Sequence, residues 1–456
     1  MPGLSTAADH SVLWFAIAAA LGAFGGRRGR RAALRGVTAV AGSSAIASGI
    51  LKRLLPRRRP PLVAFPFVGL RRPPMSSSMP SGHAASAAAF VTAASMELPV
   101  VAAPLGALAA AVAYSRVYNG VHYPGDLLLG GAIGAGVAAA TVRVWPRVDS
   151  SPASASPVPP ALARVVGTPS ADGAGLTIVV NPGAHSGRPR VLTDELQAAL
   201  PAARIEVPDS PAGIEAALRD AVARGDALGI VGGDGTVNTA AGIAVEHDCP
   251  LVVVPGGTLN HFARDLGIES VDDAARALKS GQLVAVDVGL IDRHVFVNTA
   301  SFGSYSKLVE AREHLEASIG KWAALGVALV RVLRENAPFE VTIDDRTRRI
   351  WMIFVGNCAY EPPGFAPTTR TRLDDGFFDV RIVDGSEPWA RVRLIVAALT
   401  GNLVRSRIYS RDLAPSLTCH IPERENLLAA DGEIFEGRPD FTIQKHPKPL
   451  LIYAPE

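Results

Sequence analysis

The sequence predicts two structural parts, an N-terminal all-α transmembrane helical bundle and a C-terminal soluble part with an α/β lobe and a β-rich lobe. Residues 13–145 are dominated by Ala, Gly, Leu and Val, and their charges are gathered in short clusters. After residue 175, mixed charges separate short apolar runs, as in soluble proteins. The length of 456 residues is sufficient for two or three domains.

Five apolar segments predict the helices of the bundle. They cover residues 12–24, 32–51, 84–98, 100–118 and 127–145. A membrane span needs about 20 apolar residues, so the second, fourth and fifth segments are long enough and the other two are weaker candidates. Gly130 and Gly134 have the small-xxx-small spacing that lets helices approach closely in lipid. A soluble Ala-rich bundle is the alternative, but polar helix faces are almost absent.

Composition and periodicity divide the chain into four regions. Residues 1–146 form the helical domain, and the Pro-, Ser- and Ala-rich residues 147–175 predict a flexible linker. From 176 to 338, strands alternate with helices and glycine loops, which predicts a parallel α/β lobe. From 339 to 456, segments such as FEVTIDD, RIWMIFVGN, FFDVRIVDG and PLLIYAP predict the β-rich lobe.

Cysteine spacing and the order of charges argue against several kinds of site. The formal net charge of +3 decides little by itself, and we expect no nucleic-acid partner. Cys249, Cys358 and Cys419 show no CxxC or Cys/His spacing, which argues against a disulfide framework or a zinc site. Positive residues follow the first apolar run instead of preceding it, so no cleavable signal peptide is indicated.

Three polar motifs interrupt the apolar segments, and their chemistry suits a phosphate monoester. They are Lys52 with Arg59-Pro60, then Pro80-Ser81-Gly82-His83, then Ser115-Arg116 with His122 and Asp126. Arginine and lysine can bind phosphate oxygens and offset charge in the transition state. A neutral histidine can attack phosphorus if a carboxylate orients it. Alone, the arginines could be an interfacial anchor, PSGH an ordinary turn and each histidine a solvated side chain.

In this order the three motifs resemble the signature of the type 2 phosphatidic acid phosphatase family, over residues 10–146. The resemblance implies that His122 forms a phosphohistidine, that Asp126 orients it and that His83 protonates the leaving alkoxide. It implies no metal and a phosphate held by Lys52, Arg59, Ser81, Gly82 and Arg116. The family usually has one membrane helix more than this chain offers.

A glycine-rich loop in the α/β region predicts a nucleotide site. The run Gly232-Gly233-Asp234-Gly235-Thr236 follows an apolar strand and precedes a helix, where backbone N–H groups can approach phosphate oxygens. Alone the loop is weak evidence, because neither a P-loop lysine motif nor GxGxxG is present.

The loop belongs to a series that comprises Asn181-Pro182, GGDGTVN, PGGTLN followed by FAR, and DGE at 431–433. The series resembles the diacylglycerol kinase catalytic family, which includes sphingosine and ceramide kinases, over residues 176–455. The resemblance implies a two-lobed kinase with ATP and Mg²⁺, in which Asp431 is the general base for a lipid hydroxyl and Glu433 lies beside it. It implies ATP contacts from Asn181, Gly232, Gly233, Asp234, Gly235, Thr236, Asn238, Gly257, Thr258 and Asn260.

Residues 373–377, LDDGF, resemble the structural magnesium loop of soluble bacterial members of that family. Asp375 would bind through its side chain, with backbone oxygens near Arg372 and Phe377. An ordinary turn is the alternative. His185 departs from the family pattern within NPGAHSG, and the threonine expected near residues 207–209 is missing. Apolar residues at helical spacing in 310–334 favour core packing over a lipid-facing surface.

The order of motifs and apolar segments predicts the sidedness of a multi-pass cell-membrane protein. The three phosphate motifs fall at one end of the bundle, and the segment 127–145 is the last crossing before the kinase half. Because ATP is cytosolic, the kinase half would be cytoplasmic and the phosphatase site would face outward. The cationic cluster 27–35 then lies inside, in agreement with the positive-inside rule. The cationic loop 52–72 then lies outside, which goes against that rule.

These inferences predict a bifunctional membrane lipid enzyme. One site would dephosphorylate lipid phosphates of the phosphatidic acid or isoprenoid diphosphate type, and the other would phosphorylate a lipid alcohol of the diacylglycerol type. One alternative is an isoprenoid diphosphate phosphatase whose second half phosphorylates a sphingoid base or another lipid. Another is a phosphatase whose second half senses lipid or nucleotide without catalysis.

Overall fold

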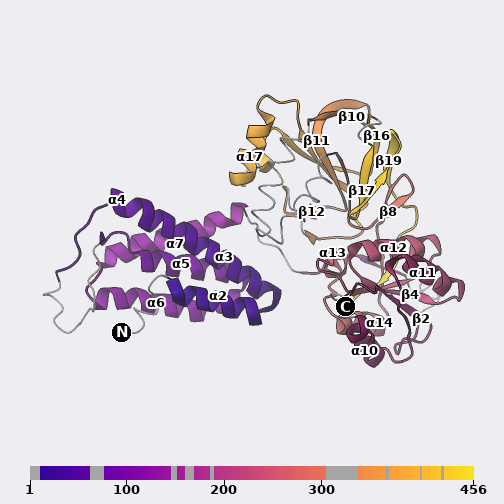
Figure 1. Cartoon of the computed structure of the whole chain (residues 1–456), viewed down its shortest axis with the longest axis horizontal. Coiled ribbons are helices and arrows are strands. Elements are labelled where there is room, and N and C mark those ends of the chain that lie inside the picture. The colour runs from indigo at the N-terminus through magenta and orange to yellow at the C-terminus, as the bar shows by residue number, and fades with distance from the viewer. Residues whose placement is uncertain are drawn as a thin grey trace. The chain divides into compact units, whose positions relative to one another are not determined.

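The computed structural model separates into two compact units, Met1–Arg147 and Val148–Glu456 (Figure 1). It describes residues 11–61, 76–144, 151–159, 169–184, 189–303, 337–364, 369–400, 403–422 and 426–455. Unit 1 is helical, and unit 2 contains two large β-sheets with helices.

Unit 1 is a bundle of packed helices, as predicted. They are α2 (Val12–Phe24), α3 (Gly26–Ser44) continued by a π-helical stretch (Ala45–Leu51) and α4 (Lys52–Leu54), α5 (Gly82–Glu97), α6 (Ala102–Tyr118) and α7 (Pro124–Val144). Among the described residues, three helices are long and apolar enough to cross a membrane: Arg28–Leu54, Pro99–Tyr118 and Pro124–Arg143. They correspond to the second, fourth and fifth predicted segments, which confirms those three candidates.

Helix α5 is the centre of the bundle and packs against α3, α6 and α7. Its alanines are buried, and α7 approaches it so closely that only glycine fits at two positions of α7. A Cβ atom at Gly130 would lie 2.4 Å from the carbonyl oxygen of Ser81, and one at Gly134 would lie 2.1 Å from that of Ala85. The predicted small-xxx-small contact is therefore present.

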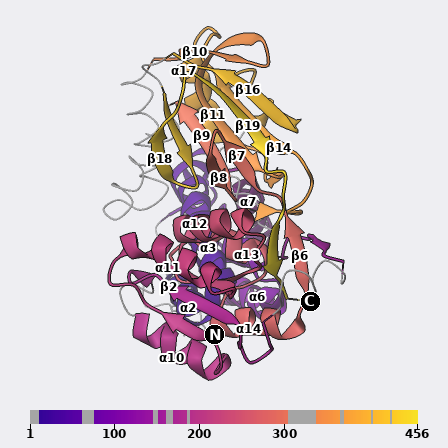
Figure 2. The same ribbon diagram turned by 90° about the vertical axis from the view of Figure 1, so that its right-hand side faces the viewer.

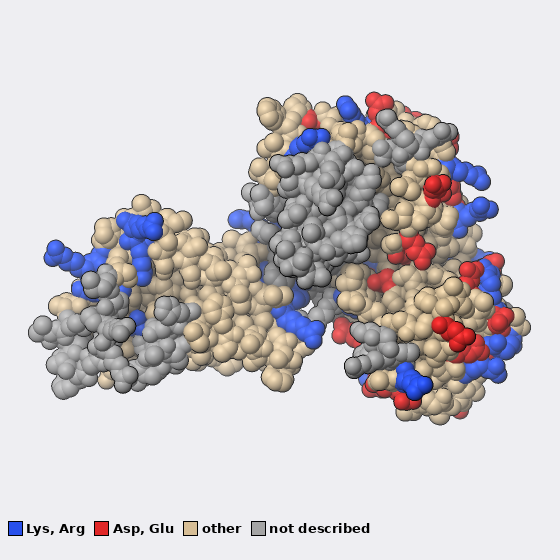
Figure 3. Space-filling model, in the orientation of Figure 1, with Lys and Arg blue, Asp and Glu red and all other residues tan. Residues whose placement is uncertain are grey.

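The charged residues of unit 1 lie toward the ends of its helices. In the face that Figure 3 shows, Lys and Arg gather toward the two ends and the middle is uncharged. At one end the fully buried Arg35 pairs with Glu97 at 2.7 Å, and it donates a hydrogen bond to Thr141. Glu97 is the last residue of α5, about 24 Å along the helix from its first turn.

The first sheet of unit 2 is the predicted α/β layer, and Figure 2 labels its strands β2 and β6. Its strand order is β1-β6-β20-β5-β4-β2-β3. The strands are β2 (Leu176–Val180), β3 (Arg204–Glu206), β4 (Ala227–Gly232), β5 (Leu251–Pro255) and β20 (Leu450–Tyr453), all parallel to their neighbours in that run, with antiparallel β6 (Leu283–Val286) and β1 (Ser156–Pro157). The helices are α10 (Pro189–Ala199), α11 (Ile214–Ala223), α12 (Asp234–Glu246), α13 (His261–Asp265) and α14 (Val271–Ser280). Strands β2, β4 and β5 are almost wholly buried, as parallel strands covered on both faces are.

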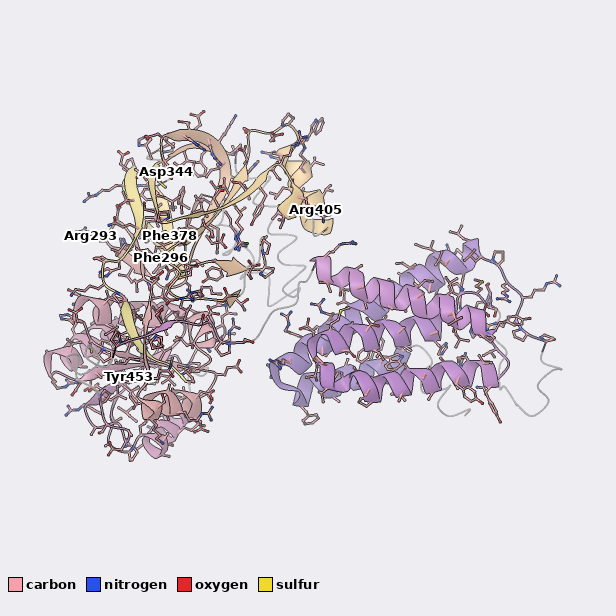
Figure 4. The ribbon with its side chains drawn as sticks, turned by 180° about the vertical axis from the view of Figure 1, so that it is seen from behind. Arg293, Phe296, Asp344, Phe378, Arg405 and Tyr453 are labelled. Carbon is pink, nitrogen blue, oxygen red and sulfur yellow. The ribbon has the colours of Figure 1, made fainter. Side chains whose placement is uncertain are left out.

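The second sheet is antiparallel and has eleven strands. It comprises β7 (Gly289–Ile291), β8 (His294–Phe296), β9 (Thr299–Gly303), β10 (Phe339–Ile343), β11 (Arg346–Asn357), β14 (Phe378–Asp384), β15 (Tyr409–Ala414), β16 (Ser416–His420), β17 (Leu427–Ala430), β18 (Glu433–Glu436) and β19 (Asp440–Lys445). Strands β12 (Tyr360–Glu361) and β13 (Thr369–Arg370) form a separate pair, and α17 (Ala390–Thr400) packs on the sheet. The rings of Phe296 and Phe378 lie side by side in its core, 5.8 Å apart (Figure 4).

Sheet membership differs from the predicted division at residue 339 in two places. The PLLIYAP segment was assigned to the β-rich lobe, but β20 lies in the α/β sheet between β5 and β6. All four residues of β20 are buried, and a continuous apolar strand suits a sheet that is covered on both faces. Strands β7, β8 and β9 precede residue 339 and belong to the eleven-stranded sheet.

Part of the predicted linker 147–175 is folded onto unit 2. Strand β1 pairs with β6, and Ala153, Ala155 and Val158 pack against the α/β core. These half-buried contacts hold the segment against unit 2, so it does not behave as a free linker. His185 and the stretch 310–334 lie outside the described residues.

Replacing Gly134 with Ala should destabilise unit 1, because the added Cβ would overlap the carbonyl oxygen of Ala85. We expect a loss of about 1–3 kcal/mol in the free energy of unfolding, measured by denaturant titration in detergent. The control Gly136→Ala places its Cβ in open space and should change this free energy by less than about 0.5 kcal/mol. Equal losses for both variants would contradict the close packing of α7 on α5.

Candidate functional sites

The three phosphate motifs come together at one end of unit 1. The first covers α4 and the segment after it, the second begins α5, and the third joins α6 to α7. The Ser81 N–H donates to the carbonyl oxygen of Asp126 at 3.0 Å, which links the second motif to the third. Arg59 donates to the carbonyl oxygen of Val121 at 2.8 Å, which links the first motif to the third.

His122 and Asp126 form a buried pair in the third motif. His122 Nδ1 lies 3.6 Å from Asp126 Oδ2, and the Tyr123 N–H donates to the same carboxylate oxygen at 2.9 Å. The other ring nitrogen, Nε2, lies 3.5 Å from Nη1 of Arg59. One imidazole nitrogen therefore faces a carboxylate and the other faces the guanidinium of Arg59.

Cations surround the imidazole of His122. Lys52 and Arg59 both donate to Ser76 Oγ, each at 3.3 Å, and Arg116 is buried at the end of α6. Burial, followed by the charges of Arg59 and Arg116, lowers the pKa of His122 to about 4. His122 is therefore neutral near pH 7, as a nucleophile must be.

The remaining predicted residues of this site lie in the first turn of α5. Ser81 is buried and caps the helix, because its Oγ accepts from the Ala84 N–H at 3.5 Å. His83 is half-buried. A Cβ atom at Gly82 would lie 3.1 Å from Ser48 Oγ, so a side chain here would require that hydroxyl to move by a few tenths of an ångström.

Two residues that the sequence did not single out also contact Asp126. Ser78 Oγ donates to Asp126 Oδ2 at 2.5 Å and lies 3.5 Å from His122 Nδ1. Arg57 Nη1 forms an ion pair with Asp126 Oδ1 at 2.9 Å, and its guanidinium lies over the ring of Tyr123. The only sequence signal for either residue is that Arg57 lies between Lys52 and Arg59, the two cations of the first motif.

The glycine loops of unit 2 meet at the carboxyl ends of three adjacent parallel strands. Asn181 follows β2, the GGDGT loop follows β4, and the PGGTLN loop follows β5. A Cβ atom at Gly257 would lie 2.6 Å from the Cα of Gly233, so the two loops touch because neither has a side chain there. This edge of a parallel sheet, with the N-terminus of α12, is where α/β proteins bind phosphate groups.

Side chains of the motifs hold these loops in place. Asn181 Nδ2 donates to Thr236 Oγ1 at 2.8 Å, and Asp234 Oδ1 accepts from the Phe262 N–H at 3.1 Å. Asn260, with a left-handed backbone (φ 48°), exchanges two hydrogen bonds with Gly257.

The predicted ATP contacts are therefore gathered at this edge, with one exception. Gly235 lies in the first turn of α12, and Thr258 is exposed on the second loop. Asn238 lies a turn further along α12, is buried and donates to the carbonyl oxygen of Val295 at 2.9 Å. The structure thus gives Asn238 a role in joining α12 to β8.

Asp431 and Gly432 form the tight turn of the β17–β18 hairpin. Both have positive φ, 47° and 90°, as a type I′ turn requires. The Asp431 carboxylate accepts hydrogen bonds from three consecutive backbone N–H groups, those of Val297 at 2.7 Å, Asn298 at 2.9 Å and Thr299 at 2.7 Å. Burial raises the pKa of Asp431 to about 7, against the opposite effect of these three donors.

Glu433 follows this turn, and its side chain is directed at the glycine loop of the other lobe. Its Oε1 lies 3.7 Å from the position that a Cβ of Gly235 would occupy. Unlike Asp431, Glu433 is exposed. The hairpin thereby brings a carboxylate to the predicted phosphate site.

Arg370 joins the two lobes. The sequence does not predict this role, because Arg370 lies in a short strand with no motif. Its guanidinium is fully buried and donates to Asp265 at 2.7 Å, to the carbonyl oxygen of Val297 at 2.7 Å and to Asn298 Oδ1 at 3.0 Å. Asp265 is the last residue of α13, the helix that directly follows the PGGTLN loop. Val297 and Asn298, the other partners of Arg370, also donate backbone hydrogen bonds to Asp431. One cation thus connects the second glycine loop to the DGE turn.

The predicted magnesium loop brings two carboxylates together. Oxygens of Asp375 and of Asp287, which the sequence did not single out, lie within 4.8 Å of each other and of Cys358 Sγ. Carboxylate oxygens suit Mg²⁺, whereas burial raises the pKa of the Cys358 thiol to about 12 and keeps it protonated. The carbonyl oxygen of Phe377 accepts from the Cys358 N–H at 3.0 Å, and the Arg372 side chain pairs with Asp374.

Comparisons with known proteins match each half separately. The PAP2 superfamily matches residues 32–149, and the diacylglycerol kinase catalytic domain matches residues 175–291. A diacylglycerol kinase of Bacillus subtilis is 30% identical over 232 residues, which cover 48% of this chain and 73% of that protein. A "Probable lipid kinase YegS-like" of Pseudomonas aeruginosa is 29% identical over 282 residues, which cover 58% of this chain and 90% of that protein.

Among solved structures, a diacylglycerol kinase from Bacillus anthracis is 19% identical, with a TM-score of 0.44 over 61% of this chain and 96% of that one. A transmembrane PAP2-type phosphatidylglycerolphosphate phosphatase from Bacillus subtilis is 26% identical, with a TM-score of 0.25 over 30% of this chain and 70% of that one.

The imidazole of His122 should titrate with a midpoint near pH 4 in the purified full chain, because burial and two cations disfavour its protonation. Nitrogen NMR of labelled histidine measures this midpoint, with the signal assigned by its loss in His122→Gln. Arg116→Met removes one cation and should raise the midpoint. A wild-type midpoint at the ordinary value of 6.5 would contradict the described environment.

Proposed function

Because the chain belongs to the diacylglycerol kinase family and also carries a PAP2 superfamily domain, we propose that it is a bifunctional membrane lipid enzyme. Unit 1 hydrolyses lipid phosphates through a phosphohistidine, and unit 2 transfers phosphate from ATP to a lipid hydroxyl, most simply that of diacylglycerol. The observation that carries the proposal is the neutral imidazole of His122, held between the carboxylate of Asp126 and the guanidinium of Arg59.

In the phosphatase reaction, His122 Nε2 attacks phosphorus while the bond to the lipid alkoxide breaks. Asp126 holds the Nδ1–H tautomer, and Ser78 and Arg57 hold Asp126. His83 gives its proton to the alkoxide, and water then hydrolyses the phosphohistidine and releases inorganic phosphate. Charge on the phosphoryl oxygens is offset by Lys52, Arg59 and Arg116, with Ser81 and Gly82 at the start of α5.

In the kinase reaction, the lipid hydroxyl attacks the γ-phosphorus of ATP and ADP leaves. The N-terminus of α12 and the glycine loops bind the phosphates, and Mg²⁺ bound with ATP would offset their charge. Both oxygens of Asp431 are engaged by backbone N–H groups, whereas Glu433 is directed at the loop. We therefore assign Asp431 to holding the hairpin and Glu433 to accepting the hydroxyl proton.

The geometry of unit 1 supports an outward phosphatase site and a cytoplasmic kinase. The phosphate motifs lie at the first turn of α7, and α7 then runs 21 residues, about 30 Å, before the chain enters unit 2. That length is sufficient for one crossing. ATP is cytosolic, so unit 2 lies inside.

The two activities should be lost independently. Purified full chain in detergent micelles is assayed for phosphate release from phosphatidic acid and for ATP-dependent phosphorylation of diacylglycerol. His122→Ala should lower the first rate by about 10³-fold or more and leave the second unchanged, and Glu433→Gln should do the reverse. The exposed His420 provides a control, His420→Ala, that should change neither rate. Loss of both activities from one substitution, or no kinase activity in the wild type, would contradict the proposal.

The two acidic residues of the DGE turn should respond differently to amide substitution. Asp431→Asn replaces an acceptor of three N–H groups and should cost about 1–3 kcal/mol in unfolding free energy. Glu433→Gln should leave that free energy unchanged and lower kcat by about 10²–10⁴-fold. If Asp431→Asn instead retained full stability and abolished the change of kcat/KM with pH near pH 7, Asp431 would be the base.

A further inference from the structure

Helix α17 is apolar on the side that faces solvent as well as on the side that packs. Ala390, Leu394 and Ala397 are buried against a small core that includes Trp351 and Met352. Val392 and Val396 lie on the other side of the helix, and each is 52% exposed. Exposed apolar side chains that lie together on a protein surface often mark a contact site, so the outward side of α17 requires an explanation.

Exposed apolar residues also lie shortly before and shortly after the helix in the chain. Trp389, directly before α17, is 78% exposed, and Val404, shortly after it, is 51% exposed. We call Trp389, Val392, Val396 and Val404 the apolar face. An amphipathic aromatic ring next to exposed aliphatic residues is typical of a surface that enters the boundary between lipid headgroups and acyl chains.

Cations border the apolar face. Arg391 and Arg393 lie on opposite flanks of the Val392–Val396 side, because successive helical positions are about 100° apart. Arg405 and Arg407 are exposed beyond the helix (Figure 4 labels Arg405). Residues 387–407 hold four arginines and one glutamate, a net charge of +3. The glutamate, Glu387, already pairs with Arg393 at 2.9 Å.

We propose that the apolar face of α17 lies on the surface of the bilayer that unit 1 spans, with its arginines on anionic lipid headgroups. The candidate membrane helices of unit 1 keep unit 2 close to lipid, which makes a bilayer the surface that the face meets most often. Long arginine side chains can keep their charge at the headgroups while their neighbours enter the interface. The proposal goes beyond the two activities, because it assigns the surface by which unit 2 contacts the membrane.

The test measures the environment of Trp389 without any turnover. The full chain, at one copy per lipid nanodisc, is compared with Trp389→Phe, and the difference in fluorescence isolates one of the five tryptophans. In discs rich in phosphatidylglycerol, lipids brominated near the headgroup should quench the Trp389 signal about two-fold or more. Discs of phosphatidylcholine alone should give less quenching, because the cations then have no anionic partner.

Two further variants make the outcome decisive. Val396→Asp places a charge on the apolar face and should abolish the quenching. Val191→Asp changes an exposed valine of α10, 45% exposed, and should leave it intact. Trp389 fluorescence that brominated lipid does not quench, or that Val396→Asp leaves unchanged, would overturn the proposal. Quenching that needs two copies per disc would assign the face to self-association instead. None of these readouts depends on phosphatase or kinase turnover.

Discussion

The close approach of α7 to α5 is the constraint on which unit 1 depends. The carbonyl oxygens of Ser81 and Ala85 occupy the space that side chains at Gly130 and Gly134 would need. This packing sets the start of α5 beside the start of α7, where the Ser81 N–H bonds to the Asp126 carbonyl. Without it, the second motif at the start of α5 would not lie beside the third motif, which holds His122 and Asp126. A membrane protein gains little from the hydrophobic effect between helices, so such packing contacts carry much of the specificity.

In unit 2, buried polar groups fix the arrangement of the two lobes, whereas small residues fix the helix packing of unit 1. The glycine loops and the DGE turn of unit 2 lie on different sheets, and the proposed phosphoryl transfer requires them to stay close together. Arg370 bonds both to Asp265, after the second glycine loop, and to the backbone that receives Asp431. A buried guanidinium with every partner in place favours one arrangement of the lobes, because any other arrangement leaves charges unpaired.

The motifs could be predicted because their chemistry depends on residue type and order, and the helices because apolar length is a strong signal. The partners of those motifs could not. Ser78, Arg57, Asp287 and Arg370 act through contacts that join distant segments, and no spacing in the sequence reveals them. The strand β20 was placed in the wrong lobe because a buried apolar run has no periodicity that distinguishes one sheet from another. The role of Asp431 as a base stays a prediction, because Asp-Gly is also the residue pair that a type I′ turn prefers.

If phosphate is removed from lipids at one membrane face and added at the other, the two sites must lie on opposite sides of the bilayer. Thiol labelling of sealed, oriented membrane vesicles distinguishes the two sides. Ser76→Cys reports on the phosphatase end and Asp440→Cys on the kinase, both at exposed positions, and the half-exposed Cys249 is replaced by alanine. An impermeant maleimide should label the first variant only from outside and the second only from inside. Labelling of both variants from the same side would contradict the account.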